Sequence, residues 1–153
     1  MSVGEITVID DSDIVGWMAA ATRTDEIYMT DVPSMVTNVL RKAGKIPITR
    51  LNILDHGNSG GVEIGNDWVD ISTFSSFEPY LLLLRGRFAK GGFVHLQHCD
   101  VGSNHALLTL FSRAFGVPVV AGTGAQNPVY RFNLGNYDRC DPSGVCTTNV
   151  GRP

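Results

Sequence analysis

Two side chains of this sequence, one imidazole and one thiol, together have the groups needed for acyl transfer. His56 lies just after the expected strand 51–54, and Cys99 directly follows the expected strand 93–98. An imidazole can accept the proton of a thiol, and the thiolate then attacks a carbonyl carbon. Gly57 has no side chain to keep a substrate away from its amide, which makes that amide a candidate donor to the oxyanion. The pattern predicts nucleophilic catalysis by Cys99, with His56 as the base.

These side chains must be placed by the strands that precede them. Apolar runs alternate with helical patterns up to about residue 122, which is typical of an α/β sandwich with a mainly parallel sheet. Ligands of such sheets bind beyond the carboxyl ends of the strands. We therefore expect the residues after 51–54 and after 93–98 to share one rim. Cys99 also precedes a predicted helix, whose first amides should favour the thiolate.

Start and stop signals define the other expected elements. Asp31 followed by Pro33 predicts the start of a helix that ends at Gly44. The segment 60–70 predicts a hairpin that turns at Gly65-Asn66-Asp67. The remaining expectations are strands at 6–9, 26–29, 117–121 and 129–134, and helices at 14–21, at 74–89 and from a Ser103 cap to Phe115.

Length and composition predict one domain without nucleic-acid or membrane partners. The chain has 153 residues, of which 43% are hydrophobic and 18% charged, and its net charge is −3 with scattered Lys and Arg. We expect a core over about 5–125 and a strand and loop extension over 126–153. The longest apolar run falls far short of the ~20 residues of a membrane span. Without a basic start and an apolar stretch, a cytoplasmic location is expected, while export by another route or excision from a larger protein stays open.

The ordered motifs resemble those of the caspase-like, or clan CD, cysteine peptidases. Asp55-His56-Gly57-x-x-Gly60 is similar to a legumain motif, as is the segment 122–128. Gln97-His98-Cys99 is similar to the Gln-Ala-Cys turn of caspases, with His98 in the place of alanine. The order of elements over roughly residues 5–125 most closely resembles an uncharacterised caspase-like domain of large bacterial surface proteins.

The resemblance implies a three-layer sandwich and a thiol protease that cleaves peptides or proteins without a metal or other cofactor. Cys99 would be the nucleophile and His56 the base, with the amides of Gly57 and Cys99 as the oxyanion hole. An alternative is a catalytically inactive, caspase-like binding module of a bacterial surface or toxin system. Taken alone, without His56, Cys99 is also consistent with a buried thiol that has only a structural role.

The resemblance also suggests which residues bind the substrate. In clan CD enzymes, the end of the first strand and the segment after the last parallel strand form part of the pocket for the residue before the cut. Here these positions are Asp10, Asp11 and Thr123, and Gln97 of the caspase-like turn joins them. The two aspartates raise the hypothesis that the pocket prefers Arg or Lys.

The remaining cysteines and histidines leave other interpretations open. The pattern of His95, His98, Cys99 and His105 suggests a metal site, but strand alternation places His98 on the opposite face from His95 and Cys99. We therefore expect no metal. His95 is expected to be a hydrogen-bonded core histidine, and His105 a surface or packing residue. Cys140 and Cys146 flank a short turn and are either a disulfide or two free thiols.

Overall fold

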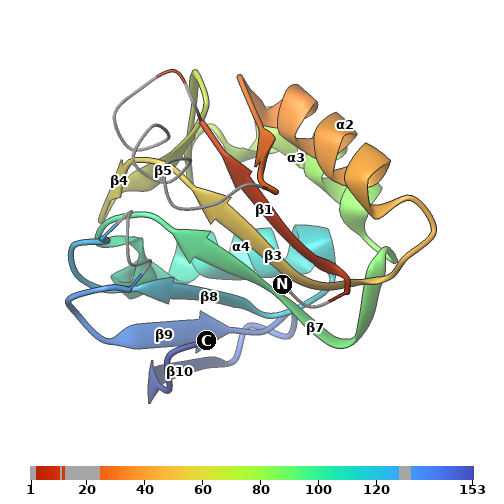
Figure 1. Ribbon diagram of the computed structural model, residues 1–153. Helices are drawn as coiled ribbons and strands as arrows, with labels where there is room; N and C mark the ends of the chain where they lie inside the picture. The colour runs from red at the N-terminus through yellow and green to blue at the C-terminus, as the bar shows by residue number, and fades with distance from the viewer. Residues whose placement is uncertain (1–2, 11, 13–24, 128–131) are drawn as a thin grey trace.

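A seven-stranded, mainly parallel sheet forms the centre of the protein (Figure 1). The computed structural model describes residues 3–10, 12, 25–127 and 132–153. Within these residues the strand order is β10-β9-β8-β7-β3-β1-β2. The pairs β10-β9 and β9-β8 are antiparallel, and the other neighbouring pairs are parallel. The strands are β1 (Glu5–Ile9), β2 (Ile27–Tyr28), β3 (Ile48–Leu54), β7 (Phe88–Gln97), β8 (Val119–Gly122), β9 (Tyr137–Cys140) and β10 (Cys146–Val150).

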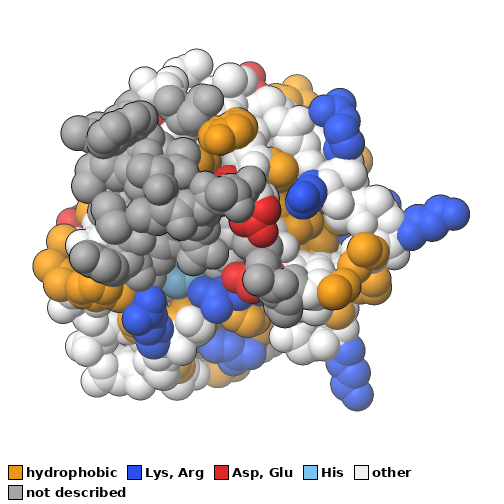
Figure 2. Space-filling model, in the orientation of Figure 1, with side chains coloured by type: hydrophobic (Ala, Val, Ile, Leu, Met, Phe, Trp, Pro, Cys, Tyr) orange, Lys and Arg blue, Asp and Glu red, His pale blue; other side chains and the backbone are white. Residues whose placement is uncertain are grey.

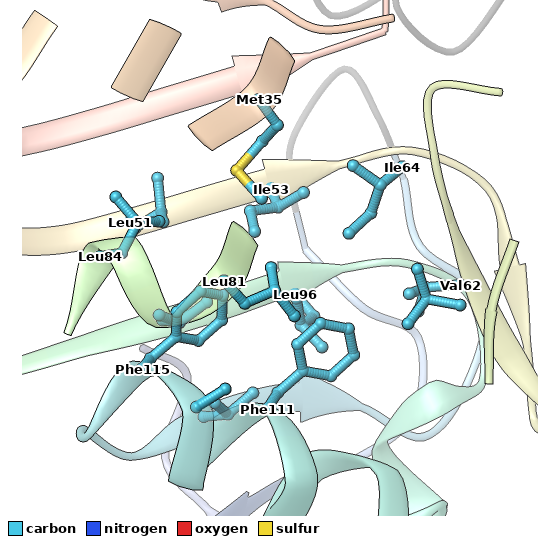
Figure 3. Close-up of a cluster of buried hydrophobic side chains, with 14 of the residues drawn as sticks. Met35, Leu51, Ile53, Val62, Ile64, Leu81, Leu84, Leu96, Phe111 and Phe115 are labelled. Atoms are coloured by element: carbon cyan, nitrogen blue, oxygen red, sulfur yellow. The ribbon is translucent and has the colours of Figure 1, made fainter. Parts of the chain in front are cut away.

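The described helices pack on one face of this sheet and enclose the hydrophobic core (Figure 3). They are α2 (Val32–Ala43), α3 (Phe74–Leu81) and α4 (His105–Phe115), with short 3₁₀ turns at η1 (Leu82–Leu84) and η2 (Val101–Ser103). Phe111 of α4 packs edge-on against Phe74 of α3, with ring centroids 5.2 Å apart. The α/β sandwich predicted from the sequence is thus present, while a third layer over the other face stays a prediction. No described helix is both long enough and apolar enough to cross a membrane.

The predicted helix at residues 32–43 and the predicted hairpin are both confirmed. The side chain of Asp31 accepts the backbone N–H of Ser34 at 2.8 Å, and Gly44 ends α2 with φ 55°. The hairpin consists of β5 (Gly61–Ile64) and β6 (Asp67–Asp70), and β4 (Gly57–Asn58) adds a third short strand. Gly65 has φ 61° and lies against the backbone of Thr30, where a Cβ would collide, so glycine is required at this turn.

The prediction of a single helix over residues 74–89 is wrong. Helix α3 ends at Leu81, and after the η1 turn the chain enters β7 at Phe88. Gly86 has φ 82°, a conformation that no α-helix contains, and Phe88 is already paired with Ile48 of β3. Sheet pairing therefore outweighs the helical spacing of the apolar residues at this point.

Three other expected boundaries also differ from the structure. Asn104, not Ser103, caps α4, because its Oδ1 accepts the N–H of Leu107 at 3.1 Å. In the expected strand 129–134, the described Asn133 forms only an isolated bridge with Gln126. The expected strand 117–121 is displaced by two residues at its start and lies at Val119–Gly122. The expected helix 14–21 lies outside the described residues.

The C-terminal extension belongs to the central sheet. Strand β9 pairs with β8, and β10 pairs with β9 so that Cys140 lies opposite Cys146. The two sulfurs form a disulfide, which settles the alternative that the sequence left open. The extension therefore covers the β8 edge of the parallel strands.

The sheet face away from the helices carries buried polar side chains. Arg50 donates to Nδ1 of His95 at 3.1 Å and to Asn52 at 2.7 Å. Because arginine can only donate, Nδ1 of His95 is the acceptor and the proton lies on Nε2. Burial, reinforced by Arg50, lowers the pKa of His95 to about 3, so the ring stays neutral. His95 is the hydrogen-bonded core histidine that the sequence predicted. Figure 2 shows several Lys and Arg side chains on the surface of the molecule in the orientation of Figure 1.

Candidate active site

The carboxyl ends of β3 and β7 bring His56 and Cys99 to one rim of the sheet. The two strands are parallel neighbours, and Leu54 pairs with Gln97, so the chain leaves both strands at the same level. Gly57 shows how closely the two segments pack, because a Cβ there would lie 2.9 Å from Cβ of His98 and 3.3 Å from the carbonyl oxygen of Cys99. The rim expected from the sequence is therefore formed.

Both reactive side chains of this rim reach the solvent. His56 is exposed, and Cys99 is partly exposed and is the free cysteine of the described chain. The imidazole of His56 lies near enough to His98 to lower the pKa of that ring. The partial exposure of Cys99 does not fit the alternative that it is a fully buried structural thiol.

Asp55 fixes the backbone that carries His56. One carboxylate oxygen accepts the N–H of His56, and the other accepts the N–H of Gly65 at the tip of the hairpin, both at 2.8 Å. The side chain is 3% exposed, so these bonds form away from bulk water. Asp55 thus clamps the His56 loop to the hairpin, a positioning role for which the sequence offered only its place in the motif.

His98 fastens the Cys99 segment to the same hairpin. Its Nε2 donates to the carbonyl oxygen of Glu63 at 2.9 Å, and a carbonyl partner requires that this nitrogen carries the proton. Complete burial lowers the pKa of His98 to about 4, so the ring is neutral near pH 7. His98 is therefore a structural bridge between the two halves of the rim.

A backbone amide is aimed at the Cys99 sulfur. The N–H of Gln126 lies 3.3 Å from Sγ, and the N–H of Asp100 donates to the carbonyl oxygen of Gly124 at 2.9 Å. Asp100 has φ 61°, which turns the chain sharply after Cys99. An N–H donor at this position stabilises negative charge on the sulfur. The sequence did not predict the role of Gln126.

The expected support from the α4 amides does not match the structure. Helix α4 starts six positions after Cys99, behind the η2 turn, and Asn104 caps its first turn. The free end of the Asn104 side chain instead donates to the carbonyl oxygen of Ser59 at 3.0 Å. Asn104 therefore connects the Cys99 side of the rim to the His56 loop, a second positioning residue that sequence reasoning missed.

Asn133 organises the segment that presents Gln126. Its Oδ1 accepts the N–H groups of Gly124 and Gly135, and its Nδ2 donates to the carbonyl oxygen of Gly124 at 2.7 Å and to Oε1 of Gln126 at 3.3 Å. Gly122 lies so close to the Asn133 side chain that a Cβ would overlap it. The loop after β8 is therefore held by one buried side-chain amide, whose hydrogen-bond partners lie up to nine residues away in the sequence.

The predicted substrate-binding residues have varied surroundings. Gln97 is buried, and its amide donates to Nδ1 of His95 at 3.4 Å, so it faces the polar side of the sheet. The hydroxyl of Thr123 accepts the N–H of Asn136 at 3.0 Å. Asp10 is 4% exposed and accepts both the N–H and the hydroxyl of Ser12. Asp11 lies outside the described residues. An acidic wall of the pocket stays a prediction.

The histidines of the metal-like pattern have separate partners. His95 binds Arg50 and His98 binds Glu63, as described above. His105 binds Asp138 through Nε2 at 2.7 Å and is partly exposed. This agrees with the surface or packing position expected for His105 and adds a carboxylate partner that the sequence did not indicate.

Comparison with known proteins identifies the family of the chain. Residues 17–127, well over half of the sequence, match the sequence profile of a family described as a domain of unknown function, DUF4347. No curated protein and no solved structure matches the chain. The matched segment contains β3, the hairpin and β7, and with them both His56 and Cys99. The chain therefore belongs to the DUF4347 family.

Proposed function

We propose that this domain is a caspase-like cysteine peptidase, with Cys99 as the nucleophile and His56 as the base. In this proposal, the parallel strands β8-β7-β3-β1 form the caspase-like sheet, and the polar face of the sheet receives the third layer of the sandwich. The resemblance of the motifs supports the assignment. The observation that carries it is the adjacency of the β3 and β7 ends, which gathers an exposed imidazole and a free thiol at one rim.

The chemistry follows from these groups. His56 removes the thiol proton of Cys99, and the sulfur attacks the carbonyl carbon of the scissile peptide bond. The amides of Gly57 and Cys99 stabilise the oxyanion, and the N–H of Gln126 stabilises the sulfur before attack. His56 then gives its proton to the leaving amine. Water hydrolyses the resulting thioester, which releases the acid product and restores the thiol.

The specificity proposed for the site concerns the residue before the cut. Asp10 follows β1, the neighbour of β3, and Thr123 follows β8, the neighbour of β7. With Asp11 they would form the walls of the pocket. Two carboxylates there favour a substrate with Arg or Lys, and profiling with a peptide library tests this preference separately from the catalytic residues.

A peptidyl acyloxymethyl ketone library tests the catalytic proposal. This probe alkylates a thiol only when the thiol is activated and the peptide binds beside it. We expect one adduct, on Cys99, by mass spectrometry of the full chain. His56→Ala should lower the labelling rate about 100-fold or more, because a general base contributes on that scale. His105→Ala is the matched control, since this histidine lies outside the rim and its variant should label normally.

Two results would overturn the proposal. One is labelling of Cys99 that is equally fast in the parent and in His56→Ala. The other is a folded parent that no member of the library labels, although iodoacetamide alkylates Cys99. The second result would favour the alternative of an inactive caspase-like binding module.

A further inference from the structure

Four side chains at the start of α4 form a second sulfur-containing group, which we name the His105 cluster: His105, Asp138, Cys140 and Cys146. They come from three elements, because His105 opens α4, Asp138 and Cys140 lie in β9, and Cys146 opens β10. Asp138 and Cys140 are two residues apart and so share one face of their strand. Cys146 lies directly opposite Cys140 in the pairing register. The fold therefore gathers His105 and the two cysteines in one place, with Asp138 beside His105.

The possible ligand atoms of the cluster converge. The ligand atoms of His105, Cys140 and Cys146 all lie within 4.8 Å of one another. Oδ2 of Asp138 lies 2.7 Å from Nε2 of His105. Ligands of a tetrahedral zinc ion, with bonds of about 2.0–2.3 Å, lie roughly 3.3–3.8 Å apart. Small side-chain shifts would satisfy this geometry once the two sulfurs separate.

The oxidation state of the sulfurs decides which chemistry the cluster has. Cys140 and Cys146 form a disulfide in the structure, and a disulfide sulfur lacks the negative charge that a metal ligand needs. After reduction, the cluster offers two thiolates, one imidazole and one carboxylate. Two soft sulfur ligands with a nitrogen and an oxygen favour Zn²⁺ over Mg²⁺ or Ca²⁺.

A metal ion has a path to this position. Cys140 is fully buried, but His105 and Cys146 are partly exposed. Both line a hollow of about 590 Å³ that also includes Thr109 and Gly144. The hollow gives an ion access to the open side of the cluster, while Cys140 closes the inner side.

We propose that reduction of the Cys140–Cys146 disulfide converts the His105 cluster into a Zn²⁺ site. A dithiol supplies the two electrons and two protons: its sulfurs become a cyclic disulfide, and Cys140 and Cys146 become thiols. Zn²⁺ then displaces the two thiol protons and binds both sulfurs, Nε2 of His105 and a carboxylate oxygen of Asp138. This site shares no residue with the proposed active site and does not depend on the proposed function.

The zinc form would connect more of the protein than the disulfide does. The disulfide joins β9 to β10, whereas zinc would also bind the first residue of α4. Asn104, which connects the two halves of the rim, directly precedes this residue. Zinc would therefore anchor α4 beside Asn104, and it would restore stability that reduction removes.

Zinc titration of the full chain tests this proposal in the Cys99→Ser background, which leaves only the two cluster thiols. The protein is reduced with a phosphine, which is removed without oxygen. We expect one Zn²⁺ per chain, release of two protons per ion, and a higher Tm than in the reduced, metal-free protein. The oxidised protein should show none of these changes. Co²⁺ in place of Zn²⁺ should give the intense visible absorption of a tetrahedral site with a thiolate-to-metal band.

Ligand variants separate this site from binding by two thiols alone. His105→Ala and Asp138→Asn should each weaken zinc binding at least tenfold, while Asn38→Ala, remote from the cluster, should bind as the parent does. The proposal fails if the reduced protein binds no stoichiometric zinc, or if His105→Ala binds as tightly as the parent. If His105→Ala does not fold, the Co²⁺ spectrum of Asp138→Asn decides whether the carboxylate is a ligand. A spectrum identical to that of the parent contradicts the four-ligand site.

Discussion

The protein combines sulfur and imidazole in two places, and the surroundings of the two pairs differ. His56 and Cys99 lie on segments that follow strands, one side chain exposed and the other partly exposed, with a backbone amide directed at the sulfur. His105 lies on a helix against a buried carboxylate, and its two cysteines lie opposite each other on paired strands. A nucleophile needs access and a stabilised charge, while a ligand or disulfide pair needs fixed positions. The same residue types therefore suit a nucleophilic thiol at the rim and a disulfide or metal-ligand pair in the His105 cluster.

The two regions also differ in how they are held. The rim around Cys99 depends on side chains that bind backbone groups: Asp55, His98, Asn104 and Asn133. The positions of the His105 cluster residues depend on the pairing of β9 with β10 and on the packing of Cys140 in the core. We therefore expect single polar substitutions to damage the rim far more than the cluster.

The largest loss of stability should come from replacing Asn133, whose side-chain amide holds the loop after β8. Asn133 is buried, and Asn133→Ala removes its part-buried hydrogen bonds to two N–H groups and one carbonyl group, at about 1–3 kcal/mol for each group that stays unsatisfied. We expect a loss of roughly 3–5 kcal/mol in the free energy of unfolding, together with slower probe labelling of Cys99. Urea unfolding measures the first effect and mass spectrometry the second. The partly exposed Asn38, whose side chain donates to the carbonyl oxygen of Tyr28 and accepts from Arg41, is the matched control. An equal loss of stability in Asn38→Ala would contradict the comparison.

The second largest effect should be a loss of stability at low pH, caused by protonation of His98. The pKa of this ring is near 6.5 in the unfolded chain and about 4 in the folded protein, so the unfolded state takes up the proton first. The stability is complete above pH 6.5 and falls as the pH decreases to about 4, by on the order of 3 kcal/mol from this ring. His98→Gln keeps a donor for the Glu63 carbonyl oxygen but does not titrate, so its unfolding free energy should depend less on pH. An identical pH dependence of parent and variant would exclude His98 as the cause.

A smaller effect should come from separating the two roles of Asn104. Asn104→Asp keeps an oxygen that caps α4 at Leu107 but removes the donor to Ser59. We expect a change in stability below about 1 kcal/mol and a several-fold decrease in the rate of probe labelling. Asn104→Ala, which loses the cap as well, should unfold about 1 kcal/mol more easily than Asn104→Asp. If Asn104→Asp labels at the parent rate, the contact to Ser59 has no part in positioning the rim.

The strands, the hairpin and the shared rim could be predicted from the sequence because each depends on a local pattern. The β-branched and apolar runs define β3 and β7, and parallel neighbours direct their ends to one edge. The failure at residues 82–89 has the opposite cause, since pairing of Phe88 with Ile48 depends on residues 40 positions apart. Gln126, Asn104 and Asn133 were missed for the same reason, because no sequence spacing indicates that their amides bind groups of distant loops.

The rate at which iodoacetamide alkylates Cys99 at pH 7 tests the central claim most directly, because this small reagent needs no substrate pocket. The parent and His56→Ala are compared by mass spectrometry of the Cys99 peptide, with His105→Ala as the control. If His56 activates the thiol, the His56 variant reacts at least about tenfold more slowly and the His105 variant reacts as the parent does. Equal rates in all three proteins would contradict the dyad.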